Sequence, residues 1–555
     1  MELVLYFASI LLFSFIIFII GNYIASYLKI ENNNYQISNF AEYGLYGIIF
    51  VSFSALLLNF FTKLSPEINF YFFIIFFLIA LFFIKKKTKV IIKTIKYSFI
   101  CALITGATLM FDNVNTPDAG VYHLPYVSIL NIDKISIGIN NIQHRYGFIS
   151  ILQYLSAISN NILFSENGIT ISLCSLFSIL IILFFNEFKK EKNNLLKFLS
   201  SIFLIFSLYE FNRFSGHGND ELSFMIYFLC TLYFFKTIIY KNENYKKLIL
   251  LISFSIALKT MLIFVIFLPI FIYFILKPKL KWFFNKVVFF SCLFVLLWFI
   301  KNFLTTSCLL YPAVITCSEN ITWSNSKKIN PSNPEKVAKS TEGAAKAWID
   351  WHKNNPDYKG TVYTYLDDVN WVKVWFKNHF PIILKSLLIL NLIIIFFIYA
   401  YKNIYDEKLK KAINLILIYN LILSLIWFIK FPLYRFGSGY IVTLNIFCYL
   451  FIWNKITFFK NLTIKKPVKK IAMYFFIFVS SSVIIKHSIR IIENFSYSSQ
   501  FPKITNEEVG VEKKLGDYYY LKKGRCFYTK LPCTSEPTHV KQIKKIYSYK
   551  VYIIE

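Results

Sequence analysis

The chain has 555 residues, of which 56% are hydrophobic and only 16% are charged. A soluble domain carries about 25% charged residues, so this composition excludes a soluble enzyme, a disordered scaffold and a small secreted disulfide protein. The formal charge of +30 comes mainly from lysines that gather between apolar runs, which is typical of the cytoplasmic loops of polytopic membrane proteins. The charge therefore indicates topology before it indicates a partner such as nucleic acid.

Fourteen apolar segments are predicted to cross the membrane, because a spanning helix needs about 20 apolar residues, with a range of about 17 to 25. They are residues 3–22, 40–61, 67–84, 97–111, 168–186, 196–210, 220–240, 246–258, 261–276, 286–303, 381–400, 412–430, 437–454 and 470–488. We therefore expect an all-α fold, a polytopic transmembrane helical bundle of about 14 spans. Juxtamembrane helices on the outer face and a small outer C-terminal appendage complete it.

Six lysine-rich loops are predicted to face the cytoplasm, because basic residues near span ends set the orientation. Residues 149–164 are apolar but short, and a crossing there would place the second of these loops outside. We therefore expect an interfacial or re-entrant helix on the outer face. The apolar stretch 246–276 has lysines on both flanks, so we expect two short crossings that meet at Lys259. The loops are 85–96, 187–197, 241–247, 277–286, 402–411 and 455–470.

This orientation places the segments 112–167, 211–219, 304–380 and 489–555 outside. It also divides the chain into five parts. They are extra N-terminal transmembrane helices at 1–96, a core at 97–303 with the outer loop 112–167, an outer loop at 304–380, C-terminal transmembrane helices at 381–488 and an outer appendage at 489–555.

Four of the nine cysteines fall in two close pairs within the outer segments, namely Cys308 with Cys317 and Cys526 with Cys533. Paired outer cysteines suit disulfides in an oxidising compartment, and we predict both bonds. Four free thiols are the alternative. No histidine spacing around these cysteines supports a zinc site.

The outer segment 111–131 holds the first candidate site. Asp112 and Asp118 follow the end of a span, and His123 comes five residues after Asp118. A partly desolvated carboxylate at a membrane rim can act as a general base towards a hydroxyl. In the alternative interpretation Asp112 caps a turn and Asp118 caps the next helix, since it follows Thr116-Pro117.

Two further outer clusters are rich in polar and ionisable residues. The first reads QHRYGF from Gln143 to Phe148 and contains His144 and Arg145. The second runs from Glu210 to Leu222 around two glycines and contains Arg213, His217, Asp220 and Glu221. Short outer hairpins usually hold inert turn residues, but this density of ionisable groups indicates a functional site.

Arginine is rare in this chain, and its five copies all fall in predicted outer segments. Arg145, Arg213 and Arg435 lie close to span ends, while Arg490 and Arg525 are expected to be surface residues. Arginine binds phosphate with two parallel hydrogen bonds, so we expect an anionic ligand such as a lipid phosphate or pyrophosphate. Binding of ordinary anionic lipid is the alternative. Lys259 interrupts an apolar run, which indicates function, or snorkelling to the interface.

The order of these motifs resembles the GT-C superfamily of integral-membrane glycosyltransferases, and more closely an uncharacterised bacterial branch of it. Asp118 with Tyr122 and His123 is similar to the catalytic aspartate motif of the first large outer loop in such families. The resemblance covers roughly residues 97–455. Its other motifs are His144-Arg145, Asp220, Lys259 with Pro269, Trp298 and Asn302 with Tyr311-Pro312, and Arg435-Phe436.

The resemblance implies transfer of a hexosyl or pentosyl group from a polyprenyl-phosphate carrier to a glycan or lipid acceptor of the cell envelope. It implies a multi-pass protein of the bacterial inner (cytoplasmic) membrane, with its site on the periplasmic face. Asp118 and Asp220 would be the catalytic residues. No cofactor is expected, although a divalent metal is not excluded. The carrier and substrate would be bound by His123, His144, Arg145, Arg213, His217, Lys259 and Arg435.

Two other functions are compatible with this pattern. An O-antigen-type polysaccharide polymerase or ligase also has about a dozen spans and outer arginines, but its essential Arg and His would be expected in a prominent late loop, and 304–380 has no Arg. A lipid-linked sugar flippase or transporter usually has two related halves and charges in the middle of its spans. Short helices directly after the fourth span would favour the glycosyltransferase.

Overall fold

Helices make up nearly all of the computed structural model. The described residues are 2–30, 40–84, 87–109, 118–211, 217–240, 242–279, 282–325, 332–355, 357, 359–368, 370–400, 409–455, 474, 477–478, 481–482, 485–486, 488–489, 492, 513–515, 518–520, 525–528, 533–534, 540 and 542–554. The predicted span at 470–488 therefore lies largely outside them.

Ten helices within the described residues are long and apolar enough to cross a membrane, which indicates a multi-pass membrane protein. They are α1 (Glu2–Tyr27), α2 (Ala41–Phe61), α3 (Pro66–Phe83), α4 (Lys87–Leu109), α7 (Asn167–Lys190), α9 (Asp220–Tyr240), α12 (Lys286–Thr306), α17 (Phe380–Ala400), α18 (Lys410–Lys430) and α19 (Tyr434–Lys455). Each overlaps a span predicted from the sequence, but α4 begins at Lys87, ten residues before the predicted span 97–111, so most of the predicted loop 85–96 is helical.

Three further predicted spans are shorter helical segments. α8 (Asn194–Glu210) and α10 (Asn242–Leu258) have 17 residues each. The third joins a 3₁₀ helix of 7 residues, η4 (Thr260–Ile266), to α11 (Phe267–Leu276) of 10 residues. A 3₁₀ helix rises about 2.0 Å per residue against about 1.5 Å for an α-helix, so this segment reaches about 29 Å, close to the hydrocarbon thickness of about 30 Å.

The chain reverses direction at Lys259, as predicted. α10 ends at Leu258, and Lys259 has an extended backbone with φ −155° before η4 begins. The ring of Tyr245, at the start of α10, packs against Trp282 and Phe283, which follow α11. The two segments on either side of Lys259 are therefore antiparallel.

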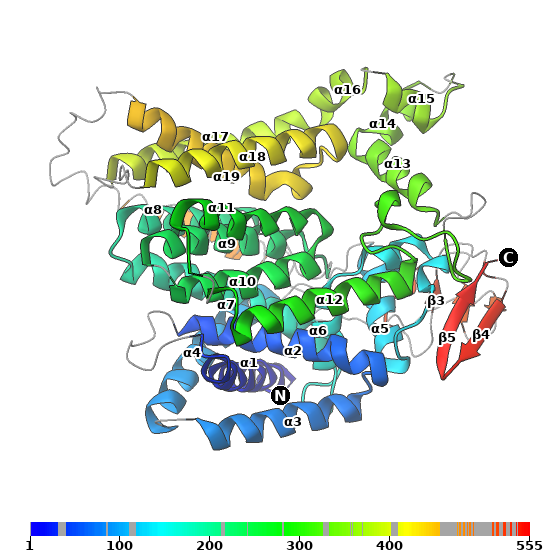
Figure 1. The fold of residues 1–555 in the computed structure, drawn as a ribbon, viewed down its shortest axis with the longest axis horizontal. Coiled ribbons are helices and arrows are strands. Elements are labelled where there is room, and N and C mark those ends of the chain that lie inside the picture. The colour runs from blue at the N-terminus through cyan, green and yellow to red at the C-terminus, as the bar shows by residue number, and fades with distance from the viewer. Residues whose placement is uncertain are drawn as a thin grey trace.

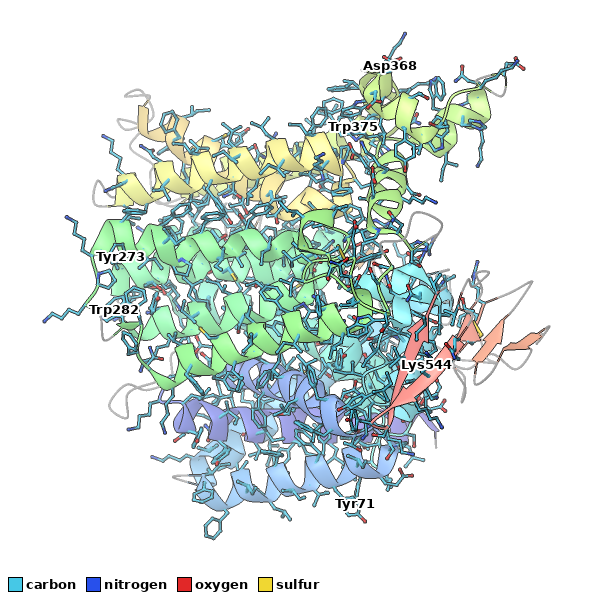
Figure 2. The ribbon with its side chains drawn as sticks, turned by 45° about the vertical axis from the view of Figure 1, so that its right-hand side comes forward. Tyr71, Tyr273, Trp282, Asp368, Trp375 and Lys544 are labelled. Atoms are coloured by element: carbon cyan, nitrogen blue, oxygen red, sulfur yellow. A yellow bond between two sulfur atoms is a disulfide. The ribbon has the colours of Figure 1, made fainter. Side chains whose placement is uncertain are left out.

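The ends of the helices gather in two groups, at opposite ends of the bundle. Ends that border the lysine-rich loops meet in buried ion pairs, where Lys236 of α9 binds Glu187 of α7 at 2.6 Å and Lys247 of α10 binds Glu42 of α2 at 2.6 Å. The described outer segments lie at the other end, and Figure 2 places Tyr273 and Trp282 opposite Lys544. The predicted alternation of the helices is thus present in the fold.

Five short helices follow α4 and lie at the end of the bundle opposite the lysine-rich loops (Figure 1). They are η1 (Ala119–His123), α5 (Leu124–Ile132), η2 (Ile139–Asn141), η3 (His144–Phe148) and α6 (Ile151–Ser159). α5 and α6 have 9 residues each, which gives a length of about 14 Å, too short to cross a membrane.

The surroundings of α6 add to one expectation. Residues 149–164 were expected to form an interfacial or re-entrant helix, and the structure has α6 there, with every residue buried within the protein. The helix begins with a capping box, in which Ser150 accepts a hydrogen bond from the backbone of Leu152 and the side chain of Gln153 bonds back to Ser150. An apolar sequence alone does not distinguish protein from lipid as its neighbour, and here packing against α2, α5 and α7 satisfies it.

The loop after α12 forms an arm of short helices that projects from the upper right of the bundle in Figure 1. Its elements are η6 (Val314–Thr316), α13 (Pro334–Ala345), α14 (Trp348–Asn354), α15 (Val362–Asp367) and α16 (Asn370–Asn378). The predicted Cys308–Cys317 disulfide is present at its base. The indole of Trp375 donates to the carbonyl oxygen of Pro432 at 2.5 Å, which anchors α16 beside the start of α19.

The C-terminal appendage contains short strands that pack on the outer helices. β1 (Lys513–Leu515) is antiparallel to β2 (Tyr518–Tyr520), which is parallel to β3 (Cys533–Thr534), while β4 (Gln542–Ile546) and β5 (Tyr549–Ile553) form a hairpin. The second predicted disulfide, Cys526–Cys533, is present. Val551 pairs with Ile137 and Lys550 binds Asp133 at 2.8 Å, so the hairpin is fixed to the segment after α4.

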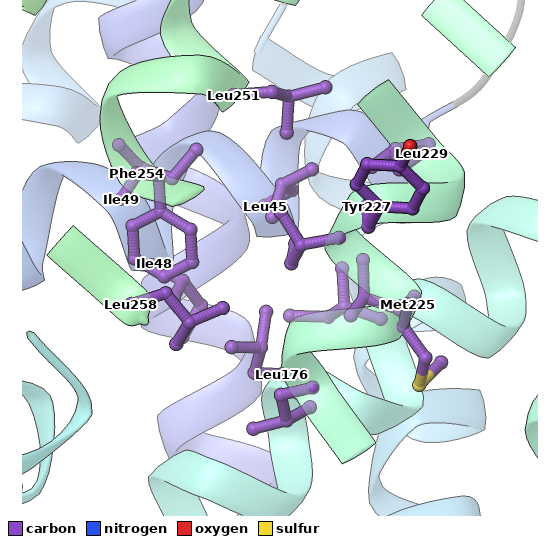
Figure 3. Packing of buried hydrophobic residues seen from close by; sticks show 14 of the residues in the cluster. Leu45, Ile48, Ile49, Leu176, Met225, Tyr227, Leu229, Leu251, Phe254 and Leu258 are labelled. Carbon is purple, nitrogen blue, oxygen red and sulfur yellow. The ribbon is translucent and has the colours of Figure 1, made fainter. Parts of the chain in front are cut away.

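The core lies where α2, α7, α9 and α10 meet. Figure 3 shows Leu45 and Ile48 of α2 facing side chains such as Met225 of α9 and Phe254 of α10. α1 and α2 cross with their backbones in contact, since a side chain at Gly47 would fall onto the carbonyl oxygen of Ile17. Small residues at a crossing let membrane helices approach closely, and this contact holds the N-terminal helices on the core.

Candidate functional site

The first half of the candidate site is an ion pair at the start of η1. Arg145 of η3 binds the carboxylate of Asp118 with its Nη1 at 3.2 Å, and the two side chains are 37% and 40% exposed. The guanidinium also lies 5.6 Å from the ring centre of Tyr122, within range of a cation–π contact. Asp118 is therefore held in place while its carboxylate stays open to a ligand.

The second half is built around Asp220, the first residue of α9. Lys259 donates a hydrogen bond to Oδ1 of Asp220, and Nε of Arg435 lies 3.8 Å from Oδ2. An acidic residue is favoured in the first turn because the N-terminus of a helix carries partial positive charge. The ring of Phe436 lies 4.7 Å from Nζ of Lys259 and 5.1 Å from the Arg435 guanidinium. Residues far apart in the chain thus form a compact group of charges.

A small pocket opens beside Asp220. Polar and aromatic side chains of α9 and α19 line it, together with Lys259 and Arg435. Its volume is about 20 Å³, which is room for about one water molecule. The pocket can therefore receive a small polar group, such as one oxygen of a larger ligand that extends outwards.

Tyr122 connects the two halves. Burial raises the pKa of its hydroxyl, the carboxylates of Asp118 and Asp220 raise it further, and Arg145 and Arg435 lower it. The protein interior screens charges weakly, so the charges of both halves act on the same buried tyrosine. The two halves are therefore linked electrostatically through Tyr122.

A pair of buried histidines lies behind Tyr122. The ring of His123 is 4.0 Å from that of Tyr122, and its Nδ1 lies 2.9 Å from Nε2 of Gln153. Gln153 also donates to the backbone oxygen of His217 at 3.4 Å. Burial lowers the pKa of His123 to about 3 and that of His217 to about 4, so both rings are neutral at physiological pH.

His217 has two unusual features. Its backbone has φ +52°, in the left-handed region that non-glycine residues rarely adopt. Its two ring nitrogens are buried, and neither has a hydrogen-bond partner among the described residues. A strained backbone and an unsatisfied polar group each carry a free-energy cost and concentrate at functional sites, so His217 is a candidate ligand-binding residue.

The structure brings together most of the residues predicted from the sequence. Three groups of contacts contain them: Asp118 with Arg145, Asp220 with Lys259 and Arg435, and His123 with His217 through Gln153. Charges of the first two groups act on both Tyr122 and His123. His144 begins η3, half-buried and next to Arg145. Arg213 and Asp112 lie outside the described residues.

Lys259 does not snorkel, because its amine is bound to Asp220 and its side chain is only 14% exposed. Sequence reasoning missed Gln153 as a part of the site, and it named Phe436 only within the Arg435-Phe436 motif of the resemblance. In the sequence, Gln153 could be recognised only as the fourth residue of the Ser150 capping box. That pattern indicates where a helix starts and does not indicate a ligand-binding residue.

Among the described residues, no three His, Cys, Asp or Glu side chains are grouped so that they could hold a metal ion. A family model described as "Domain of unknown function (DUF8201)" matches residues 3–442. No curated protein and no solved structure matches the chain.

Proposed function

We propose that this protein, which belongs to the DUF8201 family, is a membrane glycosyltransferase that uses a polyprenyl-phosphate sugar. The observation that supports this most is the pair of charged groups in the candidate site. One contains the half-exposed carboxylate of Asp118, and the other contains a lysine and an arginine around a second carboxylate. A base for a hydroxyl and cations for a phosphate are what such a transfer requires.

In the proposed reaction the acceptor hydroxyl attacks the anomeric carbon of the sugar. The hydroxyl proton passes to the carboxylate of Asp118, a new carbon–oxygen bond forms, and the bond from the anomeric carbon to the phosphate oxygen breaks. The polyprenyl phosphate leaves as an anion. Lys259 and Arg435 stabilise the charge that develops on it, and Asp220 positions both cations.

The neutral histidines contribute hydrogen bonds rather than charge. Gln153 holds His123 by Nδ1, and the ring of His217 has buried nitrogens available for sugar or acceptor hydroxyls. His144 and Arg213 remain proposed as carrier or substrate contacts. Together these groups would orient the acceptor, because a buried imidazole both donates and accepts hydrogen bonds.

The proposed setting is the inner (cytoplasmic) membrane of a bacterium, with about 14 spans and the site on the periplasmic face. Three observations support it. The lysine-rich loops border the end of the bundle opposite the site, the two disulfides suit an oxidising compartment, and short helices that cannot span the membrane follow α4. The last observation favours a glycosyltransferase over a transporter.

The test is the substitution Asp118→Asn, which keeps the shape of the side chain and removes the base. Purified protein in lipid vesicles would receive a panel of polyprenyl-phosphate sugars and membrane lipid acceptors, and mass spectrometry would follow release of polyprenyl phosphate. We expect transfer by the natural protein and a loss of about 100-fold or more in the variant. Asp350→Asn, on the exposed surface of α14, is the matched control and should keep full activity.

A correctly folded Asp118→Asn protein that transfers sugar at the natural rate would refute the assignment of Asp118. If the natural protein released no polyprenyl phosphate from any donor, the proposed function itself would be wrong.

A further inference from the structure

Residues 525–528 of the C-terminal appendage pack against the start of η1, close to Asp118 in the chain. The backbone N–H of Phe527 donates to the carbonyl oxygen of Gly120 at 3.0 Å. A Cβ added to Gly120 would lie 2.9 Å from the Cβ of Arg525 and 2.9 Å from the ring of Phe527. Residues 525–528 therefore lie in close contact with the first turn of η1, two residues after Asp118.

Several bonds fix this segment in place. The disulfide joins Cys526 to Cys533, and Oη of Tyr146 donates to the carbonyl oxygen of Cys533 at 2.7 Å. Tyr528 accepts a hydrogen bond from Asn160 at 2.7 Å. Phe527 has φ +49°, a conformation that persists only where the surroundings enforce it. Arg525 is thereby presented at a defined position with an exposed side chain.

The charge balance of the site shows what Arg525 adds. Within the described residues, the two ion-pair groups and their immediate neighbour Glu221 comprise three carboxylates and three cations. They are Asp118, Asp220 and Glu221, and Arg145, Lys259 and Arg435. Arg145 is offset by Asp118, and Lys259 and Arg435 share the single charge of Asp220. Burial raises the pKa of Glu221 to about 7, so its carboxyl offsets the remaining positive charge only in part. Among the described residues no carboxylate pairs with Arg525, which adds a further positive charge for an anion.

We infer that Arg525 binds the anionic group of the ligand, and that the Cys526–Cys533 disulfide holds it at the site. The ligand chemistry is a phosphate or pyrophosphate ester, because a guanidinium binds phosphate oxygens with two parallel hydrogen bonds. This inference rests on the proposed function and deepens it. It gives the C-terminal appendage a role in substrate binding and makes that role dependent on an oxidised disulfide.

The experiment measures binding of polyprenyl monophosphate to the full chain in lipid nanodiscs by native mass spectrometry, with the uncharged polyprenol as reference probe. The natural protein should prefer the phosphate. Arg525→Gln should weaken phosphate binding about tenfold or more, as expected for a charged hydrogen-bonding group. Arg525→Lys should restore part of it, because the charge returns without the planar fork. Lys544→Gln, an exposed cation on β4, is the matched control and should bind as the natural protein does.

Two further variants test the packing of residues 525–528 against Gly120 without changing any charge of the site. Gly120→Ala should displace residues 525–528 and cause a similar loss of phosphate binding, and so should the double variant Cys526→Ser/Cys533→Ser. Gly106→Ala is the control for the glycine change, since its Cβ would meet Phe7 at an ordinary 3.6 Å. Polyprenol binding should be the same in the natural protein and in these three variants. This separates loss of the anion contact from loss of the fold.

The outcomes separate the two proposals. A natural protein that prefers the phosphate, together with an Arg525→Gln variant that binds it equally well, would overturn the role of Arg525 and leave the proposed function standing. A natural protein with no preference for the phosphate over the alcohol would overturn both.

Discussion

Lys259 donates a hydrogen bond to the carboxylate of Asp220, which lies 39 positions earlier in the chain. The pair joins the start of α9 to the break between α10 and η4. Its two side chains are only 14% and 24% exposed, so neither charge would be stable there without the other. The ion pair therefore explains both why the chain can turn within an apolar run and why two cations converge at one end of the bundle.

The Asp220–Lys259 pair should show strong coupling in a double-mutant cycle. Lys259→Met leaves the carboxylate without its main partner, and we expect a loss of about 1–3 kcal/mol of stability. The double change Asp220→Leu/Lys259→Met removes both charges and should recover much of the loss. Thermal unfolding in detergent, followed by intrinsic fluorescence, measures both effects. A single variant as stable as the natural protein would show that the pair contributes nothing.

The buried histidines should make the protein less stable at mildly acidic pH. Burial lowers the pKa of His217 to about 4, so between about pH 6.5 and pH 4 the unfolded chain binds a proton that the folded protein does not. The contribution of each histidine to the free energy of unfolding should fall with falling pH across this window, by at most about 1.4 kcal/mol per pH unit.

The measurement is the thermal midpoint between pH 7 and pH 4.5. The thermal midpoint of His217→Gln should fall less steeply with falling pH than that of the natural protein, because one of the two buried imidazoles is removed. His352→Gln, an exposed histidine of α14, should leave the slope unchanged. Equal slopes for all three proteins would contradict the assignment.

The crossing of α1 and α2 should tolerate no side chain at Gly47. An alanine Cβ would fall onto the carbonyl oxygen of Ile17, so the two helices must separate, at a cost of about 1–3 kcal/mol for an overpacked core. We expect a lower thermal midpoint and a lower yield of folded protein for Gly47→Ala. Gly218→Ala serves as the control, because its Cβ would meet nothing within 4 Å. A Gly47→Ala protein with an unchanged midpoint would show that this contact is not close.

Cysteine labelling in intact cells tests the orientation. A membrane-impermeant maleimide should label Ile162→Cys, whose position is 60% exposed at the end where the site lies. It should label Lys189→Cys, at the lysine-rich end of α7, only after permeabilisation. Ser136 lies in the same outer segment but is buried, so it would label poorly on either side. The reverse pattern at Ile162 and Lys189 would invert the proposed topology.

Much of the fold could be predicted because the bilayer imposes simple rules on a sequence. Apolar length predicted the membrane helices. The lysines predicted how their ends alternate, which in turn predicted the reversal at Lys259. Placement of cysteines in outer segments predicted Cys308–Cys317 and Cys526–Cys533, and both bonds are present. These features depend on the local composition of the chain, which is read directly from the sequence.

Tertiary structure alone decided how the candidate site is assembled. The sequence placed Asp118, His217 and Asp220 in separate outer segments but did not show that the charges of both ion pairs act on Tyr122, because this depends on how α9, α19 and η1 pack. The sequence predicted an interfacial or re-entrant helix at α6 but not that protein side chains bury every residue of it, since apolar residues suit lipid and protein equally. Arg525 was expected to be a surface residue with no further role. Only the hydrogen bond from Phe527 to Gly120 brings it beside Asp118, through a contact between residues some 400 positions apart that no local pattern encodes.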